Sequence, residues 1–450
     1  MFGAVGAAYV FAHPPDLGGH EDFNAFYCAA RIQSTGGNPY RYEPLHSCEI
    51  QNWPPITPNE VTPAPLPPYG IAVFMPLARL PFAQAGLLWW IALVASAVVT
   101  VWAIVELTEL PLLLVATCTV VAMLVQALPS GALAPLCIAL LSAAAVALTR
   151  GRLTLAAVLL GLACLEPQVA LPPMLAAFIF LPRMRARLAG VAIAIVVVSL
   201  VTGGPALNIE YVAAVLPAHA VSELGYSAQY SLSSMLHALG FPDRAAIAAG
   251  SVQYGLFVLA GLWLARLLRR TMPESVVLVP MAFAVTGGTF IHLTQVVGAL
   301  PLAFVVAARA RSTAAWLGVA LIATPWHSVL KYNSALPAGL ILFALLAYHG
   351  RIGRAGAIVA AGLWGAAFWY LQTLEPTGSQ ILAIPAVPGS ALAEVAWRAL
   401  VGQIRPTAFS WFTHVPTYLG LLCTYWSAYR TSRGVWNRPI GVSAGALTRN

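Results

Sequence analysis

The scarcity of charged side chains constrains this chain more than any other feature of its sequence. Only 8% of its 450 residues are Asp, Glu, Lys or Arg, whereas 60% are hydrophobic. Soluble domains carry about a quarter charged residues, because a water-facing surface requires them. Most of this chain must therefore face lipid or other helices, where only helices and closed barrels satisfy the backbone. The long apolar runs predict an all-α polytopic membrane protein.

The basic residues indicate how the chain is oriented in the membrane. The net charge is +8, but the arginines are spread through short connections, and no basic cluster is interleaved with aromatic residues. We therefore expect no nucleic-acid partner. If residues 153–182, 275–308 and 313–348 are helical hairpins, these arginines fall on one side, which the positive-inside rule makes cytoplasmic. Most of the fifteen acidic residues then lie on or near the opposite side.

Three long polar segments lie on that opposite side and are expected to be outer loops: residues 13–68, 203–245 and 373–410. The arms of the hairpins are shorter than the roughly 20 residues that a full span needs. Broken helices are stable in a membrane only where they are buried in protein or line a cavity. The pattern predicts a hydrophilic cavity that opens outward. It lies within a single transmembrane domain over residues 1–427, followed by a cytoplasmic tail over 428–450.

The N-terminus is not expected to carry a cleavable signal peptide. Residues 2–12 are apolar but too short to span a bilayer, and they lack a basic leader and a small-residue cleavage site. We interpret them as the outer end of a first transmembrane helix.

The first outer loop contains a short predicted helix with an acidic start. Apolar residues recur at helical spacing from Asp22 to Ile32, and the run ends at two glycines followed by Asn-Pro. An acid at the position of Asp22 can be an N-cap or first-turn residue that the helix dipole stabilises, or it can take part in chemistry. Residue type alone leaves both interpretations open. Cys28 and Cys48 share this loop, and they would form a disulfide if the loop is outside and their separation allows it.

Five stretches resemble, in order, glycosyltransferase family 87 of the GT-C superfamily: HEDFNAFYCAARIQSTGGNPY, PLPPYGIAVFMPLARLPF, LLGLACLEPQVALPPMLAAFIFLPRMR, YSAQYSLSSMLHALG and TGGTFIHLTQVVGALPLAF. The resemblance covers residues 1–350 and departs from the family at Glu166, where a Lys usually precedes Pro-Gln. It implies a GT-C-like bundle of about 10–13 transmembrane or half-length helices with an outer-loop cap.

The resemblance also implies an activity. It indicates a membrane-embedded glycosyltransferase that moves a hexose, by analogy mannose, from a polyprenyl-phosphate donor to a hydroxyl of a glycan or glycolipid acceptor. In the implied inverting mechanism, a carboxylate removes the hydroxyl proton as the oxygen attacks the anomeric carbon. The family's catalytic acid corresponds to Asp22, with Glu21 as its competitor. The implied location is a bacterial plasma membrane, with the site facing outward.

No cofactor besides the donor substrate is expected, and no metal. Glu21 and Asp22 form the only acidic pair with ligand-like spacing, and adjacent carboxylates point in different directions on a helix. The resemblance does not demand a metal either. The sequence alone therefore predicts a metal-independent enzyme.

The phosphate that leaves needs cationic or hydrogen-bonding groups around it. Four candidates are expected to bind it: Lys331, His292, His327 and Arg31. Each has a structural alternative, because a lysine can snorkel, an intramembrane histidine can join helices and an arginine can belong to the loop surface. The same loops and helix breaks contain weaker candidates, namely Arg41, Glu166, His219 and Gln229.

Two other functions remain open on the sequence. One is a transporter or flippase of lipid-linked glycans, which predicts paired discontinuous helices in the two halves of the chain. The other is a non-catalytic membrane subunit that binds a partner through its loops. Substitution of Asp22 separates both from an enzyme, because only an enzyme would lose sugar transfer.

Overall fold

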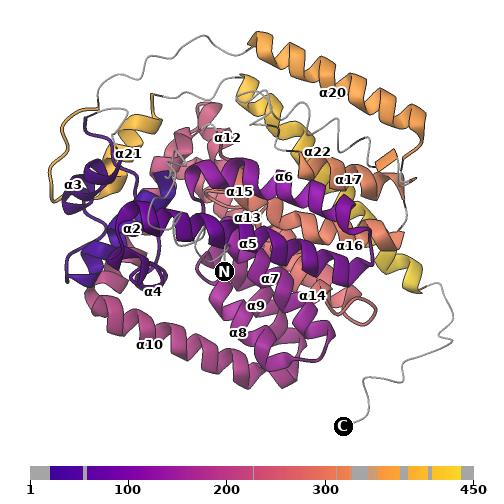
Figure 1. Cartoon of the computed structure of the whole chain (residues 1–450), viewed down its shortest axis with the longest axis horizontal. Helices are drawn as coiled ribbons and strands as arrows, with labels where there is room; N and C mark the ends of the chain where they lie inside the picture. Colours follow the sequence, from indigo (N-terminus) through magenta and orange to yellow (C-terminus); the bar gives the residue numbers. More distant parts are fainter. Residues whose placement is uncertain are drawn as a thin grey trace, which may run out of the picture.

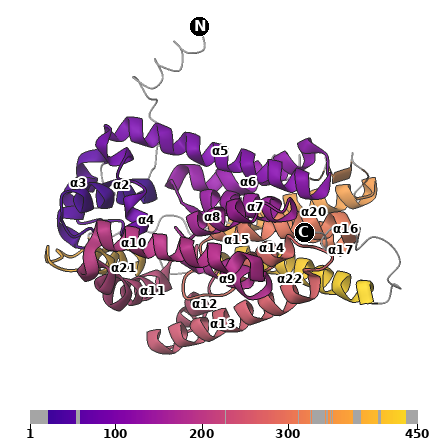
Figure 2. The ribbon, with the colours of Figure 1, turned by 90° about the horizontal axis from the view of Figure 1, so that it is seen from below.

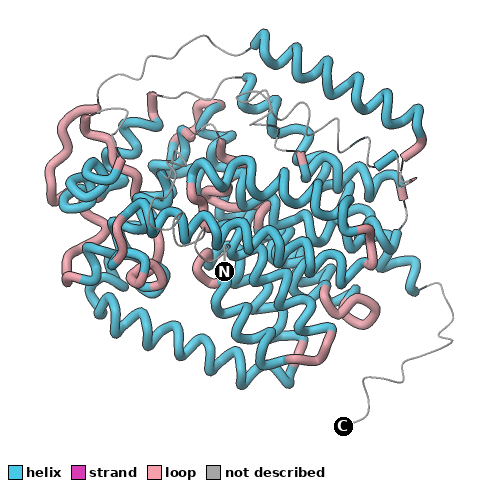
Figure 3. Tube along the Cα trace, in the orientation of Figure 1, coloured by secondary structure: helices cyan, strands magenta, loops and turns pink. Residues whose placement is uncertain are grey.

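The computed structural model describes residues 21–53, 58–226, 228–310, 312–324, 352–374, 384–403 and 408–436, with a few single residues between 326 and 350. In these residues the chain folds into helices, and its only strand-like pairings are two isolated bridges. Figure 3 shows that the described chain consists of helices and the loops between them. The fold is all-α, as the composition predicts.

Two groups of apolar helices account for the hydrophobic runs. Five described segments are long and apolar enough to cross a membrane: Phe82–Thr108 (α5), Leu112–Ser130 (α6), Pro182–Gly225 (which contains α10, Arg185–Glu210), Asp243–Leu268 (α13) and Leu293–Ala310 (α15, Leu293–Val296, to α16, Leu300–Ala310). Five more are shorter: Ala134–Thr149 (α7), Leu153–Ala163 (α8), Pro167–Phe180 (α9), Ser275–Ala284 (α14) and Thr313–Ala323 (α17). The chain is therefore a multi-pass membrane protein that mixes full-length and half-length helices.

The predicted hairpins are broken where the sequence indicates. Helix α8 ends at Ala163 and α9 begins at Pro167, a residue that suits the first helical position because no backbone donor is needed there. Helix α14 ends at Ala284, and the chain then stays irregular until α15 begins at Leu293. Of the third hairpin the structure describes α17, whereas most of the second arm lies outside the described residues.

The segment expected as a polar loop over residues 203–245 is largely helical. Helix α10 passes through a kink at Gly204, whose φ of 64° is a conformation that glycine adopts easily, and it ends at Glu210. Further helical turns follow: a π-helical turn at Tyr211–Val215, α11 (Leu216–Ser222), a 3-10 turn at Glu223–Gly225 and α12 (Leu232–Ala238). The polarity of this segment suggested a solvated loop. Its polar residues, such as His219, are instead buried against other segments.

The predicted first-loop helix is α2, which spans Glu21–Ser34 and so extends the expected helix at both ends. Its apolar face is buried. The ring of Phe23 stacks on Trp89 of α5 with 6.0 Å between centroids, and the Tyr27 hydroxyl donates to the Leu80 carbonyl at 2.8 Å. These contacts hold α2 against the membrane bundle.

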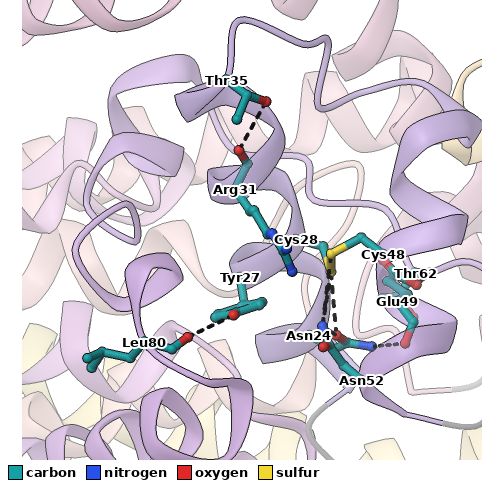
Figure 4. Close-up of a disulfide and its surroundings, with 10 residues drawn as sticks. All are labelled: Asn24, Tyr27, Cys28, Arg31, Thr35, Cys48, Glu49, Asn52, Thr62 and Leu80. Atoms are coloured by element: carbon teal, nitrogen blue, oxygen red, sulfur yellow. Dashed lines mark hydrogen bonds between the residues drawn. A yellow bond between two sulfur atoms is a disulfide. The ribbon is translucent and has the colours of Figure 1, made fainter.

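A disulfide joins Cys28 of α2 to Cys48 of α3 (Tyr42–Asn52), with 5.7 Å between the Cα atoms (Figure 4). Beside it, the Asn52 side-chain amide donates to the Asn24 side-chain oxygen at 3.0 Å. The question that the sequence left open is therefore answered by a formed bond. Disulfides persist mainly in oxidising compartments, which favours a place outside the cytoplasm for this loop.

The three polar segments expected as outer loops (the outer segments) are connected to one another. The Arg41 side chain forms an ion pair with Glu210 at the end of α10, and the Tyr42 backbone N–H donates to the Ala391 carbonyl at 2.8 Å. The second contact brings α21 (Ala393–Val401) next to the first loop. Helices α2, α3 and α21 gather at one end of the molecule in both views (Figures 1 and 2). Together they form a cap on the bundle.

Candidate functional site

A cavity of about 380 Å³ lies between this cap and the bundle. Both of the described hairpin breaks contribute to its wall, in agreement with the cavity predicted from the broken helices. Its polar and aromatic lining residues include Glu21, Asp22, Ser130, Glu166, His219, Glu223, Tyr226, His292, Gln295 and Trp397. They come from six separate parts of the chain, so the cavity exists only in the folded protein.

Asp22 lies in the first turn of α2 and reaches the cavity while half-buried. Burial raises the pKa of its carboxyl to about 7, with a further increase from Glu21 and an opposing effect of a hydrogen bond with Ser130. Glu21 lines the same cavity, although the sequence suggested that the two adjacent carboxylates would diverge. A carboxyl with this pKa can take up a proton near neutral pH, as a general base must.

Glu166 lies in the break between α8 and α9, and only 7% of its surface is exposed. The Gln295 side-chain amide donates to Glu166 Oε2 at 3.2 Å, and the Gln295 Oε1 atom accepts the His292 backbone N–H at 2.9 Å. These two bonds join the break at Glu166 to the break before α15. The glutamate is therefore a polar part of the cavity wall with partners from another helix.

Glu223 is the most buried acid of the cavity, with 2% of its surface exposed. Its Oε1 accepts the indole N–H of Trp397 at 2.6 Å, and its Oε2 accepts the side-chain amide of Gln229 at 2.6 Å. His292 Nε2 lies 3.6 Å from the same Oε2. The carboxylate is thus held in place by donors from the second and third outer segments.

His219 lies one helical turn before Glu223 and faces the same cavity. Its Nδ1 lies 3.2 Å from Glu394 Oε2, and the Ser222 hydroxyl donates to that same oxygen at 2.7 Å. Glu394 belongs to α21, so the third outer segment orients a side chain of the second. Because Nδ1 contacts Glu394, Nε2 is the other ring nitrogen of His219 that can contact a ligand.

The charges of the cavity wall are unbalanced. Four carboxylates line it, those of Glu21, Asp22, Glu166 and Glu223. Among the described lining residues there is no lysine or arginine, and the basic groups are the imidazoles of His219 and His292. A phosphate-bearing substrate entering this space would meet like charges unless something offsets them.

The phosphate-binding candidates have different positions. His292 lines the cavity, as expected of a site residue. Arg31 is exposed and is not among the lining residues, which removes geometric support for its role. Arg41 is engaged with Glu210. His327 and Lys331 lie outside the described residues.

Several side chains of the site were not singled out from the sequence, among them Glu223, Glu394 and Trp397. Glu223 had a local signal, because His219 and Glu223 are four residues apart and such residues share a face of a helix. Glu394 and Trp397 had none. Their partners are about 175 positions away along the chain, and only packing brings them together.

Comparison with known families decides the class of protein. The family model of glycosyltransferase family 87 matches residues 66–287. The chain belongs to glycosyltransferase family 87. No curated protein and no solved structure matches it.

Membership of family 87 confirms the resemblance noted in the sequence, is consistent with the GT-C superfamily, and makes this chain a membrane glycosyltransferase that acts on glycan-type substrates. The matched span of this family 87 protein contains Glu166, His219 and Glu223. It starts after α2 and ends before His292. The roles of Asp22 and His292 therefore rest on geometry and on the resemblance of the flanking stretches.

Proposed function

We propose that this family 87 glycosyltransferase moves a hexose, with mannose as the first candidate, from a polyprenyl phosphate to a hydroxyl of a glycan or glycolipid. The supporting observation is the half-buried Asp22 carboxyl at the edge of a cavity bordered by broken membrane helices. Breaks of this kind bring polar groups to the depth of a lipid-borne substrate. The proposed donor serves as substrate, and no further organic cofactor is needed.

In the proposed reaction Asp22 acts as general base. The carboxylate takes the proton of the acceptor hydroxyl while the hydroxyl oxygen forms a bond to the anomeric carbon. The bond between that carbon and the phosphate oxygen breaks, and the polyprenyl phosphate leaves with the electron pair. Attack from the opposite side of the leaving group inverts the anomeric configuration. Glu21, which lines the same cavity, is the alternative base, and His292 is proposed to hydrogen-bond the phosphate.

We place the reaction on the outer face of a bacterial plasma membrane. Two observations support this side. The disulfide between Cys28 and Cys48 lies in the loop that carries Asp22, and the arginine-rich connections belong to the other side under the positive-inside rule.

The substitution Asp22→Asn tests the proposal. Transfer from a labelled polyprenyl-phosphate hexose, measured with the purified full-length protein in liposomes, is expected to fall by about 10²- to 10⁴-fold, the usual contribution of a general base. The matched control is Asp243→Asn, because Asp243 is ion-paired to Arg398 and does not line the cavity. Unchanged transfer by Asp22→Asn would exclude Asp22 as the base. A wild-type protein that moves the intact lipid across the bilayer without sugar transfer would indicate a flippase instead.

A further inference from the structure

A cluster in the cavity wall has a composition that proton transfer by Asp22 does not require. We propose that His219, Glu223 and His292 bind a divalent first-row transition-metal ion such as Zn²⁺ or Mn²⁺. The proposed role of the ion in catalysis rests on the function proposed above, whereas its binding does not. The sequence suggested no metal, because these three residues do not form a ligand motif until the fold brings the break before α15 beside α11.

The ligand atoms of the three side chains are already close. One atom from each residue lies within 4.8 Å of the others, and His292 Nε2 is 3.6 Å from Glu223 Oε2. Tetrahedral ligands at about 2.0–2.1 Å from zinc are separated by roughly 3.4 Å, so the side chains would move inward when an ion binds. Two imidazoles and a carboxylate with an open fourth position are a common set in catalytic zinc sites.

The outer contacts of the cluster are those of metal ligands. A metal-binding histidine usually gives its other ring nitrogen to a carboxylate, which fixes the ring and its tautomer. Glu394 makes this contact with His219 Nδ1 at 3.2 Å, and the contact leaves Nε2 for an ion. Ligand carboxylates are likewise hydrogen-bonded from behind. The Trp397 indole does this at Glu223 Oε1, so that Oε2 remains for the ion.

The side chain of Gln229 marks where the ion would lie. Its amide nitrogen is 2.6 Å from Glu223 Oε2 and 3.2 Å from His292 Nε2. One amide group therefore donates toward both ligand atoms at once. A cation between those two atoms would satisfy the same lone pairs and displace the amide.

An ion here would also offset the excess of carboxylates. The described lining residues include four acids and no lysine or arginine, yet the proposed donor carries a phosphate. A divalent ion would lower the local negative charge, and its open position could accept a phosphate oxygen. The bound ion would then replace the direct hydrogen bond from His292 to the phosphate. Glu394 and Trp397 would keep two of the ligands oriented, and the cap contributes Asp22 and Trp397 to the cavity wall.

Direct binding measurements test the proposal. The purified full-length protein is treated with a chelator, freed of it and titrated with ZnCl₂ and MnCl₂ by calorimetry, with electron paramagnetic resonance for Mn²⁺. We expect one ion per chain. Glu223→Gln and His292→Asn are expected to weaken binding by more than about tenfold, and Glu394→Gln by about 10- to 100-fold. His237→Ala is the matched control, since His237 pairs with Asp243 outside the cavity and should leave the affinity unchanged.

Gel filtration and Tm show whether each variant is folded. If one of Glu223→Gln and His292→Asn does not fold, the other serves as the ligand variant. Absence of binding in the wild-type protein, or equal affinity in folded Glu223→Gln and His292→Asn, would overturn the metal site. Those outcomes leave the glycosyltransferase proposal intact, because transfer that depends on Asp22 is measured separately. Metal binding without any sugar transfer would support the metal site and contradict the proposed glycosyltransferase reaction.

Discussion

Two sets of buried acids in this protein differ in what they contact. At the arginine-rich end Glu274 is buried and ion-paired with Arg309. In the cavity Glu166 and Glu223 are similarly buried, but the contacts described for them are with amide, indole and imidazole groups. A buried carboxylate without an opposite charge is costly. We therefore expect the two cavity acids to serve the site and Glu274 to serve the fold.

The largest effect should come from pH. The pKa of Asp22 is about 7, so the rate of transfer should fall by about tenfold per unit below pH 7, or roughly 100-fold between pH 8 and pH 5. Glu21, Glu223 and His219 share its electrostatic surroundings. The residual rate of Asp22→Asn should lack this dependence. An equally steep profile in that variant would assign the titration to another group.

Asp22→Asn should lower the rate of transfer but increase the stability of the protein. Folding raises the pKa of Asp22 from 3.8 to about 7, so the unfolded chain releases this proton at a lower pH than the folded protein does. The wild-type protein should therefore become less stable as the pH rises from about 4 to about 7. Asp22→Asn removes that charge and should raise Tm at pH 8. A lower Tm together with lost activity would mean that Asp22 is structural, which would break the comparison.

Glu274→Ala should destabilise the protein by up to about 3 kcal/mol, because it leaves the Arg309 guanidinium next to buried surface without its partner. Chemical denaturation in detergent micelles measures this loss. The double variant with Arg309→Ala should recover part of it, as expected for a directly interacting pair. Transfer activity at a permissive temperature should be unchanged.

Glu166→Gln should change transfer more than stability, in contrast to Glu274→Ala. The amide keeps the shape and removes a buried charge that no described arginine or lysine balances, so stability should stay within about 1 kcal/mol or rise. Transfer should fall, by about tenfold, because the hydrogen bond from Gln295 that joins the two helix breaks loses its charged acceptor. Full activity in this variant would place Glu166 with the structural acids.

The smallest effect is expected at Glu106, which pairs with Arg150 at 2.6 Å while both side chains are about two-fifths exposed. Such pairs contribute about 0–1 kcal/mol because water already solvates both charges. Glu106→Gln should therefore change neither Tm nor transfer measurably. A large loss would contradict the assumption that an exposed ion pair contributes little to this protein.

The sequence by itself determined the membrane class, the helix that begins near Asp22 and the breaks at Glu166-Pro167 and before Leu293. These features depend on composition, on periodicity over a few turns and on single prolines, all of which are local properties. It also suggested that broken helices enclose a cavity, and it placed both members of the disulfide in one loop. The two cysteines, for example, are 20 positions apart.

Only the tertiary structure decided which polar residues share the cavity. His219 and Glu394 lie 175 positions apart, and Gln229 meets His292 across 63 positions. No spacing rule connects such residues, because their contact depends on how the second outer segment folds into α11 and how the first loop positions α21. The fold thus places Asp22 in one cavity with His219 and His292, which the sequence named only as separate candidates.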